Sequence, residues 1–262
     1  MEKRYLAPSE VAKAIIYSAE TKGDLSITRM LILGIMAGIL IGFGSFANIV
    51  ITQTLGNIDL GLSKFIGASV FPVGLILVIL SGSELFTGNN LMTIALVDGK
   101  ITFTKMIRNW FFVYLGNFIG SLLLAYIVYN SGLVNDNVLS NAQKIGLTKI
   151  SLTFQVAFVR GFLCNMLVVL AVWSATAAMD IGSKILSLWF PIMIFVLSGF
   201  EHSIANMFFL PLAIFSGLPT TWNNIWIKNL IPVTLGNIAS GGILVPLVYY
   251  ITYILPAKKK YD

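Results

Sequence analysis

Residues 198–206 read Ser-Gly-Phe-Glu-His-Ser-Ile-Ala-Asn and lie in the middle of an apolar stretch that covers about residues 184–215. The stretch is long enough to cross a bilayer. Glu201 and His202, the only histidine of the chain, are therefore expected at membrane depth, where ionisable groups are costly and usually face a polar cavity or a translocation route. Gly199 beside them predicts an interrupted helix, which lipid tolerates only where protein or water satisfies the freed backbone groups. The alternative is a structural polar plug between packed helices.

The composition is that of an integral membrane protein. Hydrophobic residues make up 57% of the 262 residues, charged residues only 11%, and the mean hydropathy is +0.87. Soluble domains carry about 25% charged residues. One cysteine excludes a disulfide within the chain, and one histidine with 11 acidic residues leaves little for a metal site, so we expect neither metal nor cofactor. The basic excess, 17 residues against 11, is assigned to the membrane surface rather than to nucleic acid.

Hydropathy predicts an all-α fold with six membrane-spanning helices, of which the second and the fifth are too long for a single crossing. The predicted spans cover about residues 30–51, 64–97, 103–130, 151–179, 184–215 and 226–255. An amphipathic surface segment, residues 1–28, precedes them, with a helix expected to start at Pro8. The polar residues 131–150 form the longest connection, predicted outside the cell, and residues 256–262 form a basic tail.

Lysine and arginine are distributed unevenly between the connections. With the N-terminus inside, the inner segments hold twelve of them and the outer segments only four. Cytoplasmic loops carry the excess of positive charge in membrane proteins. We therefore expect both termini in the cytoplasm.

An internal repeat organises the chain. The pattern Ser-Gly-x-Glu with a later Asn occurs at residues 81–89 and again at 198–206, which are 117 residues apart. An asparagine followed by Leu-Gly-Asn occupies residues 109–117 and 229–237, which are 120 residues apart. The second and fifth spans therefore correspond, as do the third and sixth. Because each unit holds three spans, the two units must have opposite orientations, which is the 3+3 inverted repeat of many transport proteins.

The repeat also predicts where the long spans break. The breaks fall near residues 83–87 and 199–203, inside the units 29–130 and 151–255. A carboxylate at such a point can accept the N–H groups that the break releases, so we interpret the repeated polar residues as structural. These residues are Glu84, Glu201, Asn89 and Asn206. A direct role of the two carboxylates in transport is the alternative.

Three motifs resemble those of the formate/nitrite transporter family. They are Leu85-Phe86-Thr87, Arg-Gly-Phe-Leu-Cys-Asn with a later Leu-Ala-Val-Trp in residues 160–173, and Gly-Phe-Glu-His-Ser-Ile-Ala-Asn-Met in residues 199–207. The resemblance implies an aquaporin-like protomer, a homopentamer with one pore per protomer, and a place in a bacterial cytoplasmic membrane. It also implies that small monovalent anions such as formate, nitrite or hydrosulfide, or their conjugate acids, pass through each pore.

The resemblance further implies roles for single residues. His202 would lie at the pore centre, Asn165 would hydrogen-bond its ring, and Thr87 would face it from a mobile loop. Lys149 would be the lysine of the outer vestibule. The residues implied as pore constrictions are Phe71, Leu75, Phe86 and Phe195.

Elementary physics agrees with these roles but leaves alternatives open. A vestibule lysine attracts anions, aromatic and aliphatic side chains oppose a bare ion, and histidine changes charge near neutral pH. Lys149 could instead be an ordinary exposed loop cation. Phe71 and Leu75 are four residues apart and could be one face of a packed helix. Arg160, within the fourth span, is interpreted as a structural anchor that needs a carboxylate or carbonyl partner.

The sequence therefore favours a passive or proton-linked channel for small monovalent anions. A neutral-solute pore of the aquaporin type is the nearest alternative, but the twin Asn-Pro-Ala motifs expected of it are absent from the sequence. A membrane enzyme is the alternative from a different class, and the chain has no convincing nucleophile and base, cofactor motif or metal cluster. Hydrophobic constrictions discriminate weakly between anions that differ by a few atoms, so the sequence does not select one substrate.

Overall fold

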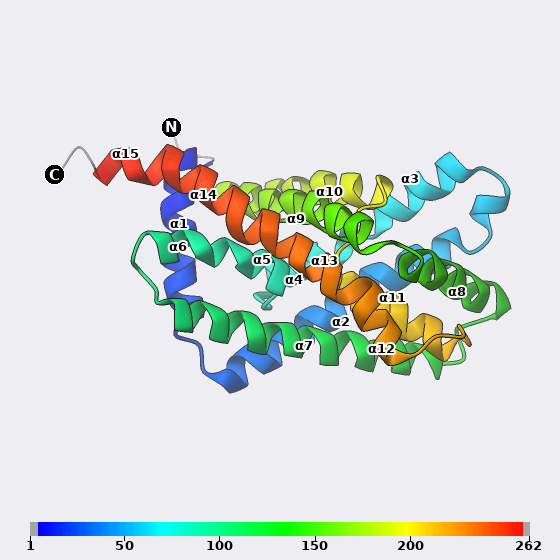
Figure 1. Cartoon of the computed structure of the whole chain (residues 1–262). Helices are drawn as coiled ribbons and strands as arrows, with labels where there is room; N and C mark the ends of the chain where they lie inside the picture. Colours follow the sequence, from blue (N-terminus) through cyan, green and yellow to red (C-terminus); the bar gives the residue numbers. More distant parts are fainter. Residues whose placement is uncertain (1–4, 259–262) are drawn as a thin grey trace.

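The computed structural model describes residues 5–258, which are helical nearly throughout (Figure 1). The one extended pairing among them is an isolated antiparallel bridge between Tyr5 and Ala178. The first helix, α1 (Pro8–Gly23), begins at the predicted proline. Residues 259–262, which belong to the predicted basic tail, lie outside the described part of the chain.

Five helical stretches among the described residues are long and apolar enough to cross a membrane. They are α2 (Ile27–Thr52), α3 with α4 (Leu60–Ser81), α7 (Phe103–Tyr129), α9 (Phe154–Ala177) and the C-terminal stretch Trp222–Ile254. The shortest has 22 residues, which at 1.5 Å per residue is about 33 Å and matches a hydrocarbon core of about 30 Å. Two shorter apolar helices, α10 (Ile181–Leu197) and α11 (Ser203–Phe215), occupy the residues predicted as the fifth span.

Other helices are short. Between α2 and α7 lie η1 (Leu55–Asn57), α3 (Leu60–Val70), α4 (Val73–Ser81), α5 (Phe86–Asn89), η2 (Asn90–Met92) and α6 (Thr93–Val97). The C-terminal stretch consists of α12 (Trp222–Ile225), η3 (Trp226–Leu230), α13 (Ile231–Asn237), η4 (Ile238–Leu244), α14 (Val245–Tyr249) and η5 (Tyr250–Ile254), with η3, η4 and η5 in the π-helical form, and α15 (Leu255–Lys258) follows it.

Two local features differ from the prediction. Residues 131–150 were expected as a polar connection, but most of them form α8 (Asp136–Ile150), whose first turn is capped because the Asn135 side chain accepts the Val138 N–H. The second predicted span has an extra interruption between α3 and α4, at Phe71 and Pro72. Proline lacks the N–H that a continuous helix would use there.

Glycines let the long helices approach closely. A Cβ atom added at Gly38 of α2 would clash with the Asn117 carbonyl of α7, and one at Gly236 of α13 would clash with the Phe158 carbonyl of α9. The helices α2 and α7 of the first unit, and α9 and α13 of the second, therefore pack backbone against backbone, as small residues allow in membrane proteins.

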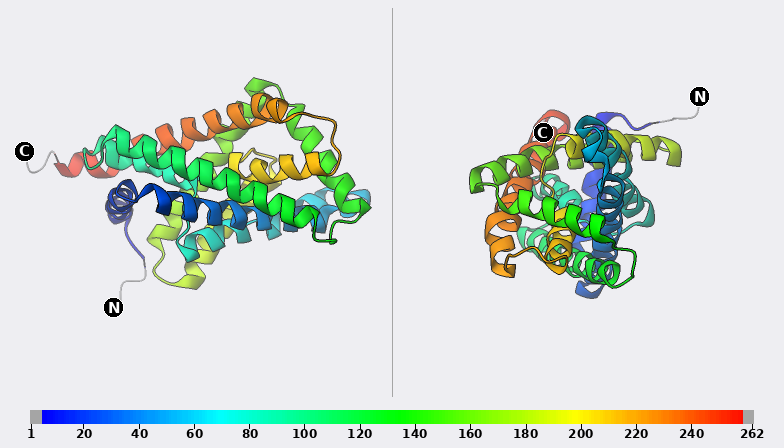
Figure 2. Two further views of the ribbon diagram at one scale, coloured as in Figure 1. Left: turned by 90° about the horizontal axis from the view of Figure 1, so that it is seen from below. Right: turned by 90° about the vertical axis from the view of Figure 1, so that its right-hand side faces the viewer.

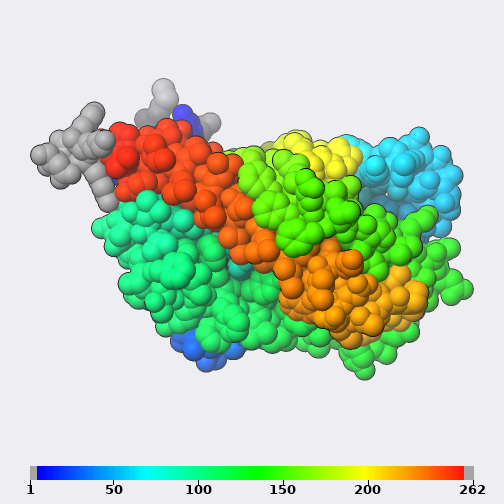
Figure 3. Space-filling view, in the orientation of Figure 1, coloured from blue at the N-terminus to red at the C-terminus, as the bar shows by residue number. Residues whose placement is uncertain are grey.

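The long helices run side by side, and α1 runs across one end of the bundle (Figures 1 and 2). The C-terminal α15 lies at that same end, which we name the α1 end, and α8 and α12 lie at the opposite end, the α8 end. On the face seen in Figure 3, α7 and the C-terminal helices lie next to each other. Of the short helices, α4 packs against α10 and α5 packs against α11.

Candidate functional site

The first break is the non-helical segment Gly82–Leu85 between α4 and α5. Gly82 has φ of 73°, in the left-handed region that favours glycine. The Ser83 N–H donates to the Val78 carbonyl (3.0 Å) and closes the end of α4. The chain then runs extended through Leu85 before it enters α5.

The second break, Gly199–His202 between α10 and α11, repeats this geometry. Gly199 has φ of 72°, and the Phe200 N–H donates to the Phe195 carbonyl (3.0 Å). His202 is extended and precedes the first residue of α11. The interruption lies at the point predicted from the internal repeat.

Buried asparagines hold both breaks from the long helices behind them. Asn117 of α7 accepts the Phe86 N–H (2.9 Å) and donates to the Glu84 carbonyl (2.9 Å) and the Gly34 carbonyl (2.8 Å). Its counterpart Asn237 makes the matching set in the second unit. It accepts the Ser203 N–H (3.0 Å) and donates to the carbonyls of Glu201 (3.1 Å) and Gly161 (2.8 Å). Backbone groups that the breaks release are thereby satisfied without water.

Each break also carries an ion pair between a buried carboxylate and a partly buried lysine. In the Lys149 cluster (Lys149, Glu201, Asn206 and Asn229), the ammonium lies 3.1 Å from both Glu201 carboxylate oxygens, and Asn206 donates to the same carboxylate (2.6 Å). Asn229 donates to that carboxylate (3.3 Å) and to the Lys149 carbonyl (3.1 Å). Glu201 is therefore held by hydrogen bonds at membrane depth, as a structural role requires.

The Lys22 cluster (Lys22, Glu84, Asn89 and Asn109) is the counterpart at the α1 end. Lys22 lies 2.6 Å from Glu84 and 2.9 Å from the Asn89 side-chain oxygen. Asn89 donates to Glu84 (2.6 Å) and to Asn109 (2.8 Å), and Asn109 donates to the Lys22 carbonyl (3.1 Å). Glu84, Glu201, Asn89 and Asn206 thus all form hydrogen bonds in or beside the breaks.

His202 lies between the two breaks and is only 3% exposed. Its Nε2 atom is 2.8 Å from the Thr87 hydroxyl of α5, and its Nδ1 atom accepts the Ala205 N–H (3.2 Å). Because Nδ1 is an acceptor, the ring proton of this geometry sits on Nε2 and points to Thr87. Thr87, in the first turn of α5, therefore hydrogen-bonds the His202 ring beside the first break.

Asn165 makes no hydrogen bond to the His202 ring, which corrects the prediction that it holds that ring. Its side-chain amide donates to the Asn237 carbonyl (2.9 Å), to Asn90 (2.8 Å) and to the Thr87 carbonyl (3.4 Å). Asn165 thus reaches His202 only through Thr87. The ring instead caps α11, because its Nδ1 atom accepts the Ala205 N–H, a contact that spacing alone did not indicate.

A cavity of about 440 Å³ leads from the α8 end to His202. Lys149 and Glu201 line its wall, and Leu60, which is 63% exposed, lies at its rim, so the cavity reaches the surface. Lys149 is in the last turn of α8 with its side chain only 13% exposed, and it lies 5.2 Å from the centre of the Phe209 ring. It is therefore a buried, paired lysine rather than a freely exposed loop cation.

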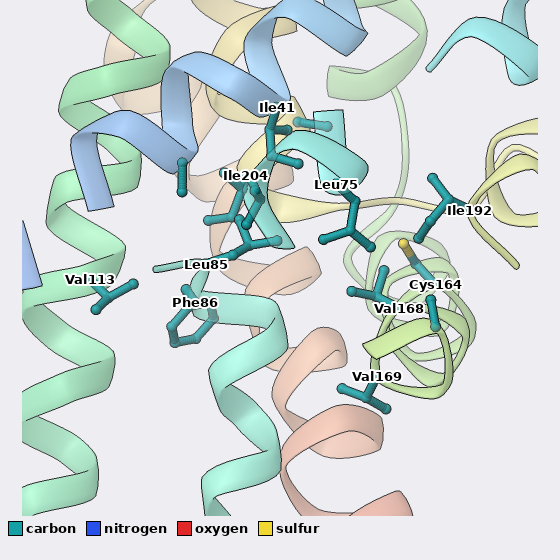
Figure 4. Close-up of a cluster of buried hydrophobic side chains, with 14 of the residues drawn as sticks. Ile41, Leu75, Leu85, Phe86, Val113, Cys164, Val168, Val169, Ile192 and Ile204 are labelled. Atoms are coloured by element: carbon teal, nitrogen blue, oxygen red, sulfur yellow. The ribbon is translucent and has the colours of Figure 1, made fainter. Parts of the chain in front are cut away.

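The four predicted constriction residues separate into two groups. Phe71 and Phe195 both line this cavity, with their rings edge to face and their centroids 5.6 Å apart. Leu75 is buried but does not line this cavity. In Figure 4 its side chain lies on the same side of the view as Cys164. Phe86 packs against Trp110 and Tyr114 of α7 (centroids 6.0 and 4.8 Å), so its ring is directed away from the cavity. These two residues are therefore not part of the cavity wall.

The sequence analysis missed Lys22 and gave no role to Asn117 and Asn237. Lys22 precedes Lys149 by 127 residues, and the same interval separates Gly34 from Gly161. Applying the interval of 127 residues to Lys149 would therefore have identified Lys22 as its counterpart. Residues 5–258 contain no group of three or more His, Cys, Asp and Glu side chains that could hold a metal ion.

These features define a class: an all-helical membrane transport protein whose polar centre lies between two interrupted helices. A family model described as "Formate/nitrite transporter" matches residues 9–251, and the chain belongs to that family. Its members are channels and transporters, not enzymes. The chain is 39% identical to the "Probable formate transporter" of Methanothermobacter thermautotrophicus, over 97% of this chain and 99% of the relative.

Two further proteins support this assignment. The chain is 41% identical to the formate channel FocA of Haemophilus influenzae, over 81% of this chain and 82% of the relative. A solved structure described as a pentameric formate channel with formate bound matches with a TM-score of 0.78 and 35% identity, over 87% of this chain and 98% of that one. The similarity therefore extends over most of the chain.

Proposed function

We propose that this protein is a channel for small monovalent anions, with formate as the first candidate, and that the anion crosses together with a proton as the neutral acid. Relatives described as formate channels or formate transporters support formate. Nitrite and hydrosulfide are of similar size and charge and remain in the proposed set. One observation carries the mechanism: His202, whose ring hydrogen-bonds Thr87, lines a cavity that is also lined by the partly buried Lys149.

The proposed architecture is an aquaporin-like protomer with six spans in a 3+3 inverted repeat. In it, α10 and α11 together make the broken fifth span, and α3 to α6 make the broken second. The matching bonds of the Lys22 and Lys149 clusters at opposite ends support this arrangement. We place the α1 end in the cytoplasm, because the connections of that end carry the excess of basic residues.

Proton-linked transport follows from the cost of desolvation. Lys149 focuses a positive field on the cavity and draws anions toward it. Beyond it, the paired rings of Phe71 and Phe195 offer no polar partner, so a bare anion would lose its hydration without compensation. A neutral acid avoids most of that cost. The anion therefore takes up its proton in the cavity before it passes the rings.

His202 serves in this proposal as a hydrogen-bonding group rather than as the proton source. Its Nδ1 atom accepts the Ala205 N–H, so a proton added there would break the cap of α11. The Nε2–H and the Thr87 hydroxyl remain as one donor and one donor–acceptor, which match the C=O and O–H of a carboxylic acid. The pair thus replaces part of the hydration that the permeant acid has lost.

The proposed assembly is a homopentamer in a bacterial cytoplasmic membrane, with one pore in each protomer. The similar solved structure is a pentameric formate channel, which supports this assembly, and the native mass of the purified protein in mild detergent tests it. A monomeric or dimeric mass in several detergents would contradict it.

Uptake of labelled anions into proteoliposomes tests the function. Formate should enter faster than into empty liposomes and should accumulate when the interior is made alkaline. Nitrite, hydrosulfide, acetate and lactate in the same assay rank the substrates. Uptake of water or glycerol without formate uptake would instead favour a neutral-solute pore, and consumption of formate in sealed vesicles would favour an enzyme.

A further inference from the structure

Arg160 occupies an unusual place in the cavity wall. It lies in α9, and its backbone carbonyl accepts the Glu201 N–H (3.2 Å) that holds the second break. Its side chain is half-buried and lines the cavity together with Lys149, Phe200 and His202. A guanidinium at this depth is expected to have a partner.

No residue within 5–258 supplies that partner, because none forms a hydrogen bond or ion pair with the Arg160 guanidinium. The nearest carboxylate partner of the cavity, Glu201, is already occupied by Lys149, Asn206 and Asn229. Arg108 shows the contrast: its guanidinium donates to the carbonyls of Gly23 (2.7 Å) and Leu25 (3.1 Å) and is used to hold α1. The charge of Arg160 is therefore available to whatever enters the cavity.

The repeat indicates that the fold does not need an arginine here. The equivalent position in the first unit is Leu33, whose carbonyl accepts the Glu84 N–H at the same distance, 3.2 Å. Holding a break thus requires only the backbone at this position. The guanidinium is an addition in the second unit, on the side where the large cavity lies.

We infer that the Arg160 guanidinium is the docking group for planar oxyanions in the cavity, and that it makes the protein favour carboxylates over round anions. This inference rests on the proposed function, because the ligand is the permeating anion. A guanidinium offers two parallel N–H donors that match the two oxygens of a carboxylate, whereas the ammonium of Lys149 is a point charge. Lys149 draws in any anion, and Arg160 selects by shape.

Two variants and a matched control separate shape from charge. Arg160→Lys keeps the charge and removes the planar fork, and Arg160→Leu introduces the residue that the first unit carries. Lys64→Gln removes a cation from the same cavity without touching Arg160. The first readout needs no transport: ¹³C-formate NMR line broadening by the purified protein. The second is the KM for formate and for hydrosulfide in proteoliposomes.

The inference predicts that Arg160→Lys and Arg160→Leu lose most of the formate line broadening, whereas Lys64→Gln keeps it. It also predicts that Arg160→Lys raises the KM for formate about tenfold and that for hydrosulfide less than twofold. Line broadening that is equal in wild type and Arg160→Lys, or KM values that rise equally for both anions, would overturn it. Wild type that broadens formate but does not transport it would contradict the proposed function and leave the docking role standing.

Discussion

The two breaks differ at two positions that are equivalent in the internal repeat, in which equivalent residues are 117 apart. Leu85 in the first half corresponds to His202 in the second, and Thr87 corresponds to Ile204. Around these positions the two breaks make the same bonds. An asparagine of a long helix donates to the backbone carbonyl of the glutamate, and a lysine forms an ion pair with the carboxylate of that glutamate. Leu85 cannot cap its helix, whereas the His202 side chain caps α11. The repeated residues build the breaks, and the residues that differ supply the polar pair at the centre.

The Lys22 cluster at the α1 end and the Lys149 cluster at the α8 end also make similar bonds but have different surroundings. The Lys22 side chain is 26% exposed, against 13% for Lys149. The pocket beside Lys22 is only about 70 Å³ and is lined by α1, whereas the cavity beside Lys149 is about 440 Å³. The Lys149 cluster therefore lies beside a large cavity, whereas the Lys22 cluster lies beside a small pocket that α1 covers. A functional difference between them must come from their surroundings, not from their hydrogen bonds.

Removing the lysines should give the largest effect and should separate the two ends. Lys149→Met leaves the Glu201 carboxylate buried without its cation, which typically costs about 3–5 kcal/mol. Lys22→Met should cost less, because Lys22 is the more exposed of the two. Thermal unfolding in detergent measures both. Equal losses would show that exposure does not distinguish the clusters.

The double variant Lys149→Met with Glu201→Gln is the control for this prediction. It removes both charges and should recover most of the stability, while formate uptake stays low because the attracting field is gone. Wild-type uptake should also fall toward the variant level at high salt, since the Debye length is about 8 Å at 0.15 M. Uptake that recovers with stability would assign Lys149 a purely structural role.

Replacing the asparagines behind the breaks should give equal effects and sharpen the comparison. Asn237→Leu leaves one backbone N–H and two carbonyls without their bonds, at about 1 kcal/mol or more for each. Asn117→Leu removes the same number of bonds in the first unit. We expect both to lower the unfolding temperature by the same amount. A clear difference between the two unfolding temperatures would mean that the two breaks have similar geometry but that their hydrogen bonds contribute differently to stability.

We expect the smallest effect on stability from replacing Phe195 or Phe86, which were both predicted from the sequence as constriction residues. Phe195→Leu and Phe86→Leu each remove aromatic contacts and should each lower stability by about 1 kcal/mol. Only Phe195 lines the cavity, so only Phe195→Leu should let chloride leak into proteoliposomes. If Phe86→Leu leaks as much, the barrier extends to the first break and the original grouping of the four constriction residues is correct.

The sequence was informative wherever a residue repeats or breaks a pattern. Gly199 marked the second break, and the recurrence of Glu and Asn in both halves indicated a shared structural role. In both clusters the asparagine donates a hydrogen bond to the carboxylate. The spacing of motifs carried this information because backbone conformation and repeat symmetry depend on sequence position alone.

The directions of side chains were not available from the sequence. Phe86 precedes Thr87 by one residue, yet at the start of α5 the two point to opposite sides, one to α7 and the other to His202. The partner of Asn165 was likewise wrong, because its choice between the His202 ring and the Thr87 carbonyl depends on how α9 is rotated against the breaks. Lys22 was missed because its cluster forms only when α1 folds across the end of the bundle.

Charge and proton movement recorded together during formate entry test the central claim most directly. Proteoliposomes with wild type and with His202→Asn, whose shorter side chain can still cap α11, are given a formate pulse while current and internal pH are followed. The account predicts one proton for each formate and no net current in both proteins, with a slower rate in the variant. Formate current that appears in His202→Asn without proton uptake would contradict it and would make His202 the proton donor.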